Sequence, residues 1–468
     1  NAIRVIGEDD GRFDNTDYIL FYGQSPHKWN YSPAENRFIH RMNIYSDKTF
    51  FFLTFGGTNG LRIQKNDNGS RLTADAVFDW FDYFTFHEDE KENICNEGRI
   101  VLGERFDQNL IYTFNHSLTN ISSDKSVNVY FSGISIAPSS SNLFLRINGN
   151  SASVMNFNAY VPNYDCFTSG GLRTGSISTV NPSVELSFVY DKPNISSKAW
   201  LDYYELHCTR KLIFSEGYMP FRNIRSAPAT VAGYRLSNLP STYQLLDVTD
   251  PLNVKQQEIF MDNGEFVFRG QPGGLIRQYV LNDGNTLSPA FEGTVANQNL
   301  HATGVTQFII VSPPEFMDAS NKLAEFHRTH DNLSTLVVTP QQIYNEFSSG
   351  SQDISAIRDF FKHVYYSNTN PVNQLRYAMF MGDASYDYKN KIVNNTNFVP
   401  TYESEPNWDI NTTYFCSDDF FGFLDPMDGQ WAGNQKLEIP VNRLPVASSE
   451  EAMSMVDKII NYKNSASL

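Results

Sequence analysis

Residues 8–17 bring several carboxylates together around a glycine. The segment reads Glu-Asp-Asp-Gly-Arg-Phe-Asp-Asn-Thr-Asp, with candidate metal ligands at Asp9, Asp14 and Asp17. Carboxylate oxygens are the ligands that Ca²⁺ prefers, but the spacing is not that of an EF-hand. The same residues suit a solvated turn, in which Asp side chains accept backbone hydrogen bonds. We favour the turn and keep Ca²⁺ binding as the alternative.

A second group of carboxylates comes directly after the apolar run 376–381. Residues 382–388 read Gly-Asp-Ala-Ser-Tyr-Asp-Tyr, with carboxylates at Asp383 and Asp387. Open α/β sheets place functional loops at the carboxyl ends of their strands, so these side chains could orient a neighbouring group or bind Ca²⁺. Alternatively, Gly382 permits a tight turn whose backbone Asp383 caps. We again favour the turn, and apart from Ca²⁺ we expect no cofactor.

A cysteine nucleophile needs a base such as a histidine nearby. The sequence pairs none of the cysteines with such a base. The four are far apart, so zinc or redox motifs of the CxxC type are excluded: Cys95, Cys166, Cys208 and Cys416. His207 and Cys208 are adjacent, and on a strand they would point to opposite faces. Cys416 could act only if a histidine approached it. Walker A, GxGxxG, GxSxG and HExxH patterns do not occur in the sequence.

Composition limits the classes of protein that the chain can represent. It has 468 residues, 41% of them hydrophobic and 14% aromatic, which is enough for two or three packed domains. The net charge of −16 repels phosphate backbones and anionic lipid, so we expect no nucleic-acid partner. The strongest apolar run, residues 50–55, has the length of a strand and not of a membrane helix.

Residues 1–300 show the pattern of short strands and turns. In residues 184–190 apolar side chains alternate with other residues, and the runs 258–261 and 265–268 flank Asp-Asn-Gly, which is a strong hairpin signal. Strands at this spacing are typical of β-sandwiches. We therefore predict a β-rich domain over residues 1–100 and one or more sandwich-type domains over residues 101–300.

From about residue 305 the pattern changes to buried strands that alternate with helices. Continuous apolar runs at 306–311, 333–338 and 376–381 are typical of a parallel sheet, and helical stripes lie between them. This order predicts a doubly wound α/β domain with a mostly parallel sheet over residues 305–468. The chain opens on a strand pattern and stops just after a helix at Leu468. We expect it to be the first half of that domain within a longer protein.

Several stretches resemble the gingipain-like C25 family of cysteine peptidases. In the carboxyl-terminal part they are residues 338–347, 353–366, 380–388, 439–445 and 451–462. The forms QQIYNEFSSG (341–350) and GDASYDY (382–388) look more like the sortase of the type IX secretion system than like the secreted gingipains. The β-rich part is similar to the same branch of the family at residues 7–23, 200–206 and 247–251.

The resemblance implies a caspase-like α/β domain behind β-rich domains. It also implies a cysteine peptidase and transpeptidase that removes the C-terminal signal of secreted cargo and links the cargo to surface lipopolysaccharide. The implied partners are the outer-membrane barrel PorV, other attachment-complex proteins, the C-terminal signal domain of cargo and a lipopolysaccharide acceptor. The implied location is the cell surface of a Bacteroidetes-type bacterium, in association with the outer membrane.

The sequence departs from the family in one respect. The catalytic histidine of the family follows a glycine, and none of the nine histidines here does. We therefore place no catalytic residue in this chain, expect the histidine and cysteine beyond Leu468, and expect the chain alone to be inactive. Two alternatives remain open, a secreted gingipain-like endopeptidase and a non-catalytic surface adhesion or scaffold protein with a degenerate peptidase domain.

Overall fold

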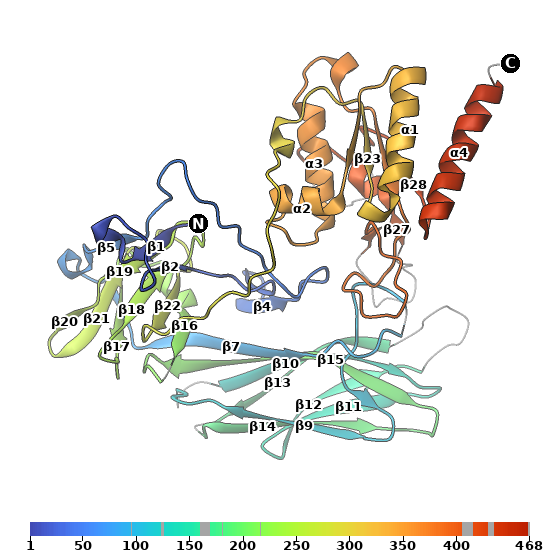
Figure 1. Cartoon of the computed structure of the whole chain (residues 1–468). Coiled ribbons are helices and arrows are strands. Elements are labelled where there is room, and N and C mark those ends of the chain that lie inside the picture. Colours follow the sequence, from blue (N-terminus) through green and yellow to red (C-terminus); the bar gives the residue numbers. More distant parts are fainter. Residues whose placement is uncertain are drawn as a thin grey trace.

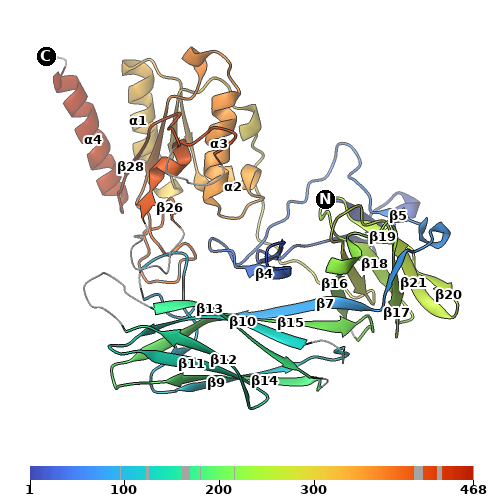
Figure 2. The same cartoon turned by 180° about the vertical axis from the view of Figure 1, so that it is seen from behind.

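A β-sandwich forms the middle of the molecule (Figures 1 and 2). The computed structural model describes the whole chain except residues 95, 123–125, 160–168, 180, 216, 405–414, 429–434 and 467–468. One sheet of this middle sandwich has the strand order β13 (Ser169–Ser178), β10 (Ser126–Ile136), β15 (Lys198–Lys211), β7 (Trp80–Glu88), and β8 (Arg105–Phe106) also pairs with β15. The other sheet has the order β12 (Asn150–Phe157), β11 (Ser141–Ile147), β14 (Ser183–Asp191), β9 (Ile111–Ser117).

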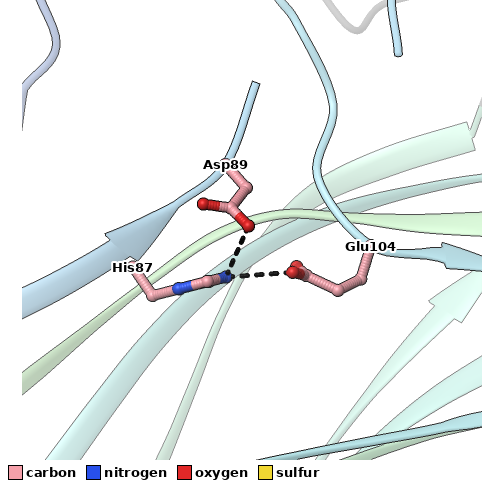
Figure 3. A group of neighbouring side chains, drawn as sticks. All are labelled: His87, Asp89 and Glu104. Carbon is pink, nitrogen blue, oxygen red and sulfur yellow. Dashed lines mark hydrogen bonds and ion pairs between the residues drawn. The ribbon is translucent and has the colours of Figure 1, made fainter. Parts of the chain in front are cut away.

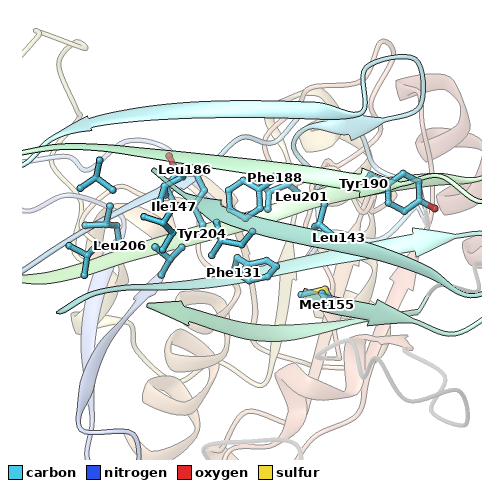
Figure 4. Packing of buried hydrophobic residues seen from close by; sticks show 14 of the residues in the cluster. Phe131, Leu143, Ile147, Met155, Leu186, Phe188, Tyr190, Leu201, Tyr204 and Leu206 are labelled. Carbon is cyan, nitrogen blue, oxygen red and sulfur yellow. The ribbon is translucent and has the colours of Figure 1, made fainter. Parts of the chain in front are cut away.

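The core of the middle sandwich forms because apolar residues alternate along its strands. In β14 the buried side chains are Val184, Leu186, Phe188 and Tyr190, as the sequence pattern predicts. They meet Phe131, Tyr204 and other side chains of the facing sheet between the two layers (Figure 4). Successive strand residues point to opposite faces, so a period of two fills one face only.

A second, flanking sandwich combines strands that precede the middle sandwich in sequence with strands that follow it. One of its sheets has the order β16 (Tyr218–Arg222), β22 (Gln278–Asn282), β18 (Gln244–Asp247), β19 (Lys255–Gln257), β5 (Gln64–Asn66). The other has the order β20 (Phe260–Asp262), β21 (Glu265–Gly270), β17 (Ala232–Leu236), β6 (Ala76–Phe78). The hairpin predicted at Asp-Asn-Gly joins β20 and β21, with Asn263 and Gly264 both at positive φ.

The β-rich part is divided differently from the predicted ranges 1–100 and 101–300. Strands β5 and β6 pair with β19 and β17, which follow the middle sandwich in sequence. The middle sandwich, residues 80–211, is therefore inserted into the flanking one, and a boundary near residue 100 is wrong. Sequence patterns report single strands and not their long-range partners, so the insertion was not visible.

Shorter elements precede these sheets. The opening residues form β1 (Ile3–Ile6), which pairs with β2 (Tyr18–Phe21). A hairpin of β3 (Lys28–Ser32) and β4 (Arg37–Arg41) follows. Glu205 of β15, which is fully buried, holds this hairpin in place. Its carboxylate accepts hydrogen bonds from the His40 backbone at 2.9 Å and from the His40 side chain at 2.7 Å. Residues 50–55 form no strand, and Phe55 is 98% exposed.

The carboxyl-terminal part is an α/β region whose sheet is entirely parallel, which confirms the predicted fold class. The strand order is β24 (Thr335–Val338), β23 (Phe308–Val311), β25 (Tyr377–Met381), β28 (Val441–Leu444). Helices α1 (Met317–His330) and α4 (Ser449–Ala466) cover one face, and α2 (Pro340–Phe347) and α3 (Ile354–Tyr366) cover the other. The α/β region lies over the middle sandwich, with the flanking sandwich to one side (Figures 1 and 2).

Local sequence signals account for the helices of the α/β region. Thr339 and Gln342 form a capping box at the start of α2, with Pro340 in the first turn. Asp353 is the N-cap of α3 and accepts a hydrogen bond from the Ser355 backbone at 2.7 Å.

Candidate active-site edge of the α/β region

The carboxyl ends of β25 and β28 form the edge of the sheet at which open α/β folds place their functional loops. Strand β25 ends at Met381, and the chain turns at Gly382, whose φ is +127°. A Cβ atom at this position would lie 2.7 Å from the Cβ of Phe398. The close approach and the positive φ both require glycine here.

Asp383 and Asp387 organise the loop that follows. The two carboxylate oxygens of Asp383 accept hydrogen bonds from the Ala384 backbone at 2.9 Å and the Thr396 hydroxyl at 3.0 Å. Asp387 is largely buried and accepts one from the Ile392 backbone at 2.7 Å. These contacts of Asp383 are those of the turn interpretation. Ca²⁺ binding by either residue stays a prediction.

Arg443 of β28 ties this loop to the sheet edge. Its guanidinium forms a two-pronged ion pair with Asp418, at 2.8 Å for each nitrogen–oxygen contact. It also donates to the carbonyl oxygens of Gly382 at 2.9 Å and Val399 at 2.8 Å. Planar, bidentate pairing fixes a guanidinium in one orientation. Arg443 thus fixes the positions of three loop segments at this edge, a role that no local motif indicated.

A hollow of about 360 Å³ lies beside Arg443 at the same edge. Its walls are the loop after β25 and the short strand β27 (Cys416–Ser417), which pairs with β26 (Tyr402–Glu403). The lining residues are Ala384, Ser385, Tyr386, Thr401, Cys416, Ser417, Asp418 and Arg443. The edge therefore has a concave surface in which a peptide segment could be held.

Cys416 lines this hollow but is not set up as a nucleophile. Partial burial raises the pKa of its thiol, and the nearby carboxylates of Glu403 and Asp418 raise it further. The thiolate is the reactive form, so these surroundings suppress its reactivity. Each of the nine histidines forms a hydrogen bond with a group other than a cysteine.

The other cysteines offer no dyad within the described residues. Cys208 belongs to the core of the middle sandwich, and burial raises its pKa to about 12. Its neighbour His207 points the other way and contacts Glu205 at 2.9 Å, as expected for adjacent strand residues. Cys95 and Cys166 lie outside the described residues. The expectation that the catalytic pair lies elsewhere stays a prediction.

The acidic segment near the amino terminus forms a surface turn. The Asp14 carboxylate accepts hydrogen bonds from the Thr16 backbone at 2.9 Å and the Thr16 hydroxyl at 2.7 Å, and these bonds lower the pKa of Asp14. Asp17 accepts one from the Asp14 backbone at 2.9 Å, and Asp9 is exposed in a short 3₁₀ turn. This geometry is that of the turn interpretation. Ca²⁺ binding by these residues remains a prediction.

The middle sandwich also contacts the candidate edge, through its connection between β7 and β8. The Gly98 backbone donates to the Glu403 carboxylate and the Arg99 side chain to the Glu403 carbonyl, both at 2.7 Å. A Cβ on Gly98 would lie 2.3 Å from the Tyr388 ring and 2.6 Å from the Tyr386 carbonyl oxygen. A residue with a side chain would not fit at position 98 without movement of this loop.

An ion-pair cluster strengthens the same contact. Lys389, whose side chain is only 7% exposed, contacts Glu90 at 2.9 Å and Asp47 at 2.6 Å. The rings of Tyr45 and Tyr388 pack with their centroids 4.8 Å apart. The residues of these pairs are 299 to 343 positions apart in sequence, so sequence reasoning had no signal for them. Tyr45, Asp47, Glu90 and Gly98 thus contact the loop that follows β25.

Two buried carboxylates lie at this contact. Glu97 is 4% exposed and Glu403 is 1% exposed. Burial, and then the charge of Glu403, raise the pKa of Glu97 to about 7, and burial also raises the pKa of Glu403. Two carboxyl groups in one desolvated site cannot both ionise without a free-energy cost. The contact is therefore sensitive to protonation near neutral pH.

The α/β region matches a known peptidase family. Residues 301–468 match the model of peptidase family C25. This match covers the α/β region and its candidate edge. No curated protein matches the chain.

The fold likeness extends across the β-rich part as well. The structure is similar to that of dimeric latent PorU from Porphyromonas gingivalis, with a TM-score of 0.81 and 23% sequence identity over 98% of this chain. The chain spans 44% of that PorU chain. The two proteins therefore share a fold, with β-rich units before a C25-type α/β region.

Among the described residues, no helix is long and apolar enough to cross a membrane.

Two carbohydrate-binding modules of the CBM36 type show much weaker similarity. One, in complex with calcium and xylotriose, has a TM-score of 0.16 and 15% identity, covering 20% of this chain and 71% of its own. The other, from a xylanase of the hindgut metagenome of Trinervitermes trinervoides, has a TM-score of 0.19 and 11% identity, covering 26% of this chain and 96% of its own. Neither match supports a functional argument.

Proposed function

We propose that the chain is part of a type IX secretion sortase, a cysteine peptidase and transpeptidase. The observation that carries the proposal is the PorU-like fold over 98% of the chain. The C25 match alone covers residues 301–468 and would suit any member of that peptidase family. The likeness in the β-rich part is what favours the sortase over a secreted gingipain-like endopeptidase.

The proposed reaction is an acyl transfer. A cysteine thiolate attacks the carbonyl carbon of the bond between cargo and its C-terminal signal, and that C–N bond breaks as the signal leaves with a protonated amine. The resulting thioester is then attacked by an amine of lipopolysaccharide, or by water, and the thiol is restored. In this scheme Arg443, Asp418 and Gly382 shape the sheet edge beside which the cargo segment lies.

The proposal assigns the nucleophile to a cysteine other than Cys208 or Cys416. Both thiols have raised pKa values, so little of either is ionised at neutral pH. The proposed partners are the barrel PorV with other attachment-complex proteins, the C-terminal signal domain of cargo and the lipopolysaccharide acceptor. The proposed location is the cell surface, in association with the outer membrane.

Labelling of the intact source protein tests the assignment of the nucleophile. A thiol-reactive peptidyl electrophile is added, and the modified cysteine is mapped by mass spectrometry. We expect one fast-reacting cysteine that is neither Cys208 nor Cys416, and Cys416→Ser should leave the labelling rate unchanged. Selective labelling at Cys416 would overturn the assignment. If no cysteine reacts selectively, the non-catalytic scaffold becomes the better interpretation.

A second assay separates the sortase from an endopeptidase. The intact protein is incubated with cargo that carries its C-terminal signal and with a soluble primary amine. A sortase should release the signal and join the amine to the new carboxyl terminus of the cargo, which mass spectrometry detects. Hydrolysis alone, unchanged as the amine concentration rises, would contradict the transpeptidase and favour the endopeptidase.

A further inference from the structure

A histidine and two carboxylates meet at the base of the connection between β7 and β8 (Figure 3). His87 lies near the end of β7, Asp89 follows that strand, and Glu104 comes directly before β8. The Nε2 atom of His87 is 3.1 Å from Glu104 Oε1 and 4.0 Å from Asp89 Oδ2. Within the described part of the chain this is the one group of three such side chains whose ligand atoms all lie within 4.8 Å of one another.

The Glu104 carboxylate has an unused oxygen in this group. The side chain is 5% exposed, and Oε1 accepts hydrogen bonds from His87 and from Lys91. Its other oxygen, Oε2, is buried and has no hydrogen-bond partner among the described residues. Figure 3 shows the carboxyl end of Glu104 pointing toward the His87 ring. A buried carboxylate oxygen without a donor is unfavourable, and a bound cation would satisfy it.

His87 is held in place for such a role. Its ring stacks on Tyr204, with centroids 5.3 Å apart and planes 21° apart, and it contacts Phe114 at 4.5 Å. The imidazole is therefore oriented by aromatic packing before any ion arrives. A ligand fixed in advance loses little conformational entropy when it binds.

Lys91 shows that the group already stabilises a positive charge. Its ammonium group is 2.8 Å from Glu104 Oε1 and 2.6 Å from Asp89 Oδ2. The Lys91 side chain is 53% exposed, so it can turn into solvent. Its departure would leave one imidazole and two carboxylates facing a single point.

We propose that His87, Asp89 and Glu104 form a binding site for a divalent transition-metal ion, represented by Zn²⁺, which competes with Lys91. One imidazole nitrogen and two carboxylate oxygens suit Zn²⁺, whereas Ca²⁺ and Mg²⁺ favour oxygen ligands alone. Tetrahedral ligands with bonds of about 2.0–2.1 Å lie roughly 3.3 Å apart, so small shifts of the present atoms are enough. The proposal does not depend on the peptidase function.

The ion would join the two ends of the connection between β7 and β8. Residues 89–104 carry Gly98 and Arg99, which contact Glu403 beside the candidate edge. A metal that binds at residues 87, 89 and 104 would fix the base of this connection while leaving its tip unchanged. We therefore expect bound Zn²⁺ to reduce hydrogen exchange at the base of the connection, next to residues 89 and 104, and to leave exchange at Gly98 and Arg99 unchanged.

Calorimetric titration of the whole metal-free chain with Zn²⁺ tests the site. His87→Gln and Glu104→Gln should each weaken binding by at least about 100-fold, because loss of even an outer-shell partner costs 10–100-fold. Lys91→Met removes the competing cation and should tighten binding. The matched control is His330→Gln, an exposed histidine that contacts Asp331 at 2.8 Å, and it should bind Zn²⁺ as the unaltered chain does.

The outcomes separate this site from surface histidines. Equal affinity in the unaltered chain and in His87→Gln would overturn the proposal, as would loss of binding in His330→Gln. Absence of binding by the unaltered chain would also overturn it and would leave Lys91 as the resident cation. If Glu104→Gln does not fold, the double variant His87→Gln with Lys91→Met supplies a second comparison. It should lose the tighter binding of Lys91→Met.

Discussion

The α/β region and the β-rich part hold their strands together over very different spans of sequence. In the α/β region, β23, β24 and β25 follow one another along the chain and lie side by side in the sheet. In the β-rich part, β6 near residue 77 pairs with β17 near residue 234. The sheet of the α/β region is built from strands and helices that neighbouring residues specify. The pairing of β6 with β17 also requires the middle sandwich, which lies between them in sequence. Changes in each part should therefore have different consequences.

The largest expected effect comes from emptying one core at a time. Phe188 in the middle sandwich and Phe361 in the α/β region are both fully buried. Replacement of either by alanine should cost about 3–5 kcal/mol of unfolding free energy, through lost burial and a cavity. Calorimetry should show a lowered transition for the altered part alone. If both variants lower every transition equally, the two parts unfold as one unit.

The protonation of Glu97, at the contact between the middle sandwich and the α/β region, should make the stability of the folded chain depend on pH. Its pKa is about 7 in the folded chain and 4.5 in a model peptide, so the folded state binds the proton more tightly. Stability is then highest below pH 4.5 for this group and falls as pH rises toward 7, by about 3 kcal/mol at most. Glu97→Gln should remove that part of the pH dependence.

The control for this prediction lies inside the middle sandwich. Burial raises the pKa of Asp202 to about 7 as well, and the charge of Asp202 is a minor cause of the raised pKa of Glu97. Asp202→Asn should therefore remove its own part of the pH dependence and lower the pKa of Glu97 slightly. Limited proteolysis between pH 5 and 8 can distinguish the two, because only Glu97 lies at the contact with the α/β region. Cleavage near residues 385–404 that responds equally to both variants would contradict the assignment.

A side chain at position 98 should loosen the contact between the two parts. Gly98→Ala places a Cβ 2.3 Å from the Tyr388 ring, and overpacking of this kind costs about 1–3 kcal/mol. Hydrogen exchange in the loop after β25 should increase while the strands of the middle sandwich keep their protection. Gly304→Ala is the matched control, because nothing lies within 4 Å of that position and its φ is not positive. Unchanged exchange in Gly98→Ala would mean that the contact does not order this loop.

The smallest expected effect concerns a purely local signal. Thr339 caps α2 by accepting a hydrogen bond from the Gln342 backbone at 3.1 Å. Thr339→Ala should lower the stability of the α/β region by about 1 kcal/mol, whereas Thr339→Ser should restore most of it. Chemical denaturation followed by far-ultraviolet circular dichroism measures the difference. A loss equal to that of Phe361→Ala would show that the capping box does more than satisfy the helix terminus.

Sequence reasoning succeeded where structure depends on neighbouring residues. The structure has the parallel strands predicted at 306–311, 333–338 and 376–381, and it has the hairpin predicted at Asp-Asn-Gly. It failed where a contact joins distant segments, as for β6 with β17 or Gly98 with Glu403. The alternation of apolar residues identifies a buried face but not the element that covers it.

The candidate site shows the same division. The loop at Asp383 could be placed at the sheet edge because it follows an apolar strand. The role of Arg443 could not be foreseen, since its partners come from residues 382, 399 and 418. Residues 50–55 read as a strand by composition, yet they pair with no neighbouring strand in the described part of the chain, and residues 51–55 are exposed.

The insertion of one sandwich into the other has a consequence for how the chain is made. Strand β6 leaves the ribosome about 156 residues before its partner β17, and β5 leaves it about 191 residues before its partner β19. At synthesis rates of roughly 5–20 residues per second, these edges stay unpaired for roughly 8–40 s. The middle sandwich can fold during that interval, and its completion brings the late strands back beside the early ones. The order of synthesis therefore lets the middle sandwich fold before the flanking sandwich, which is completed only when β17 and β19 pair with β6 and β5.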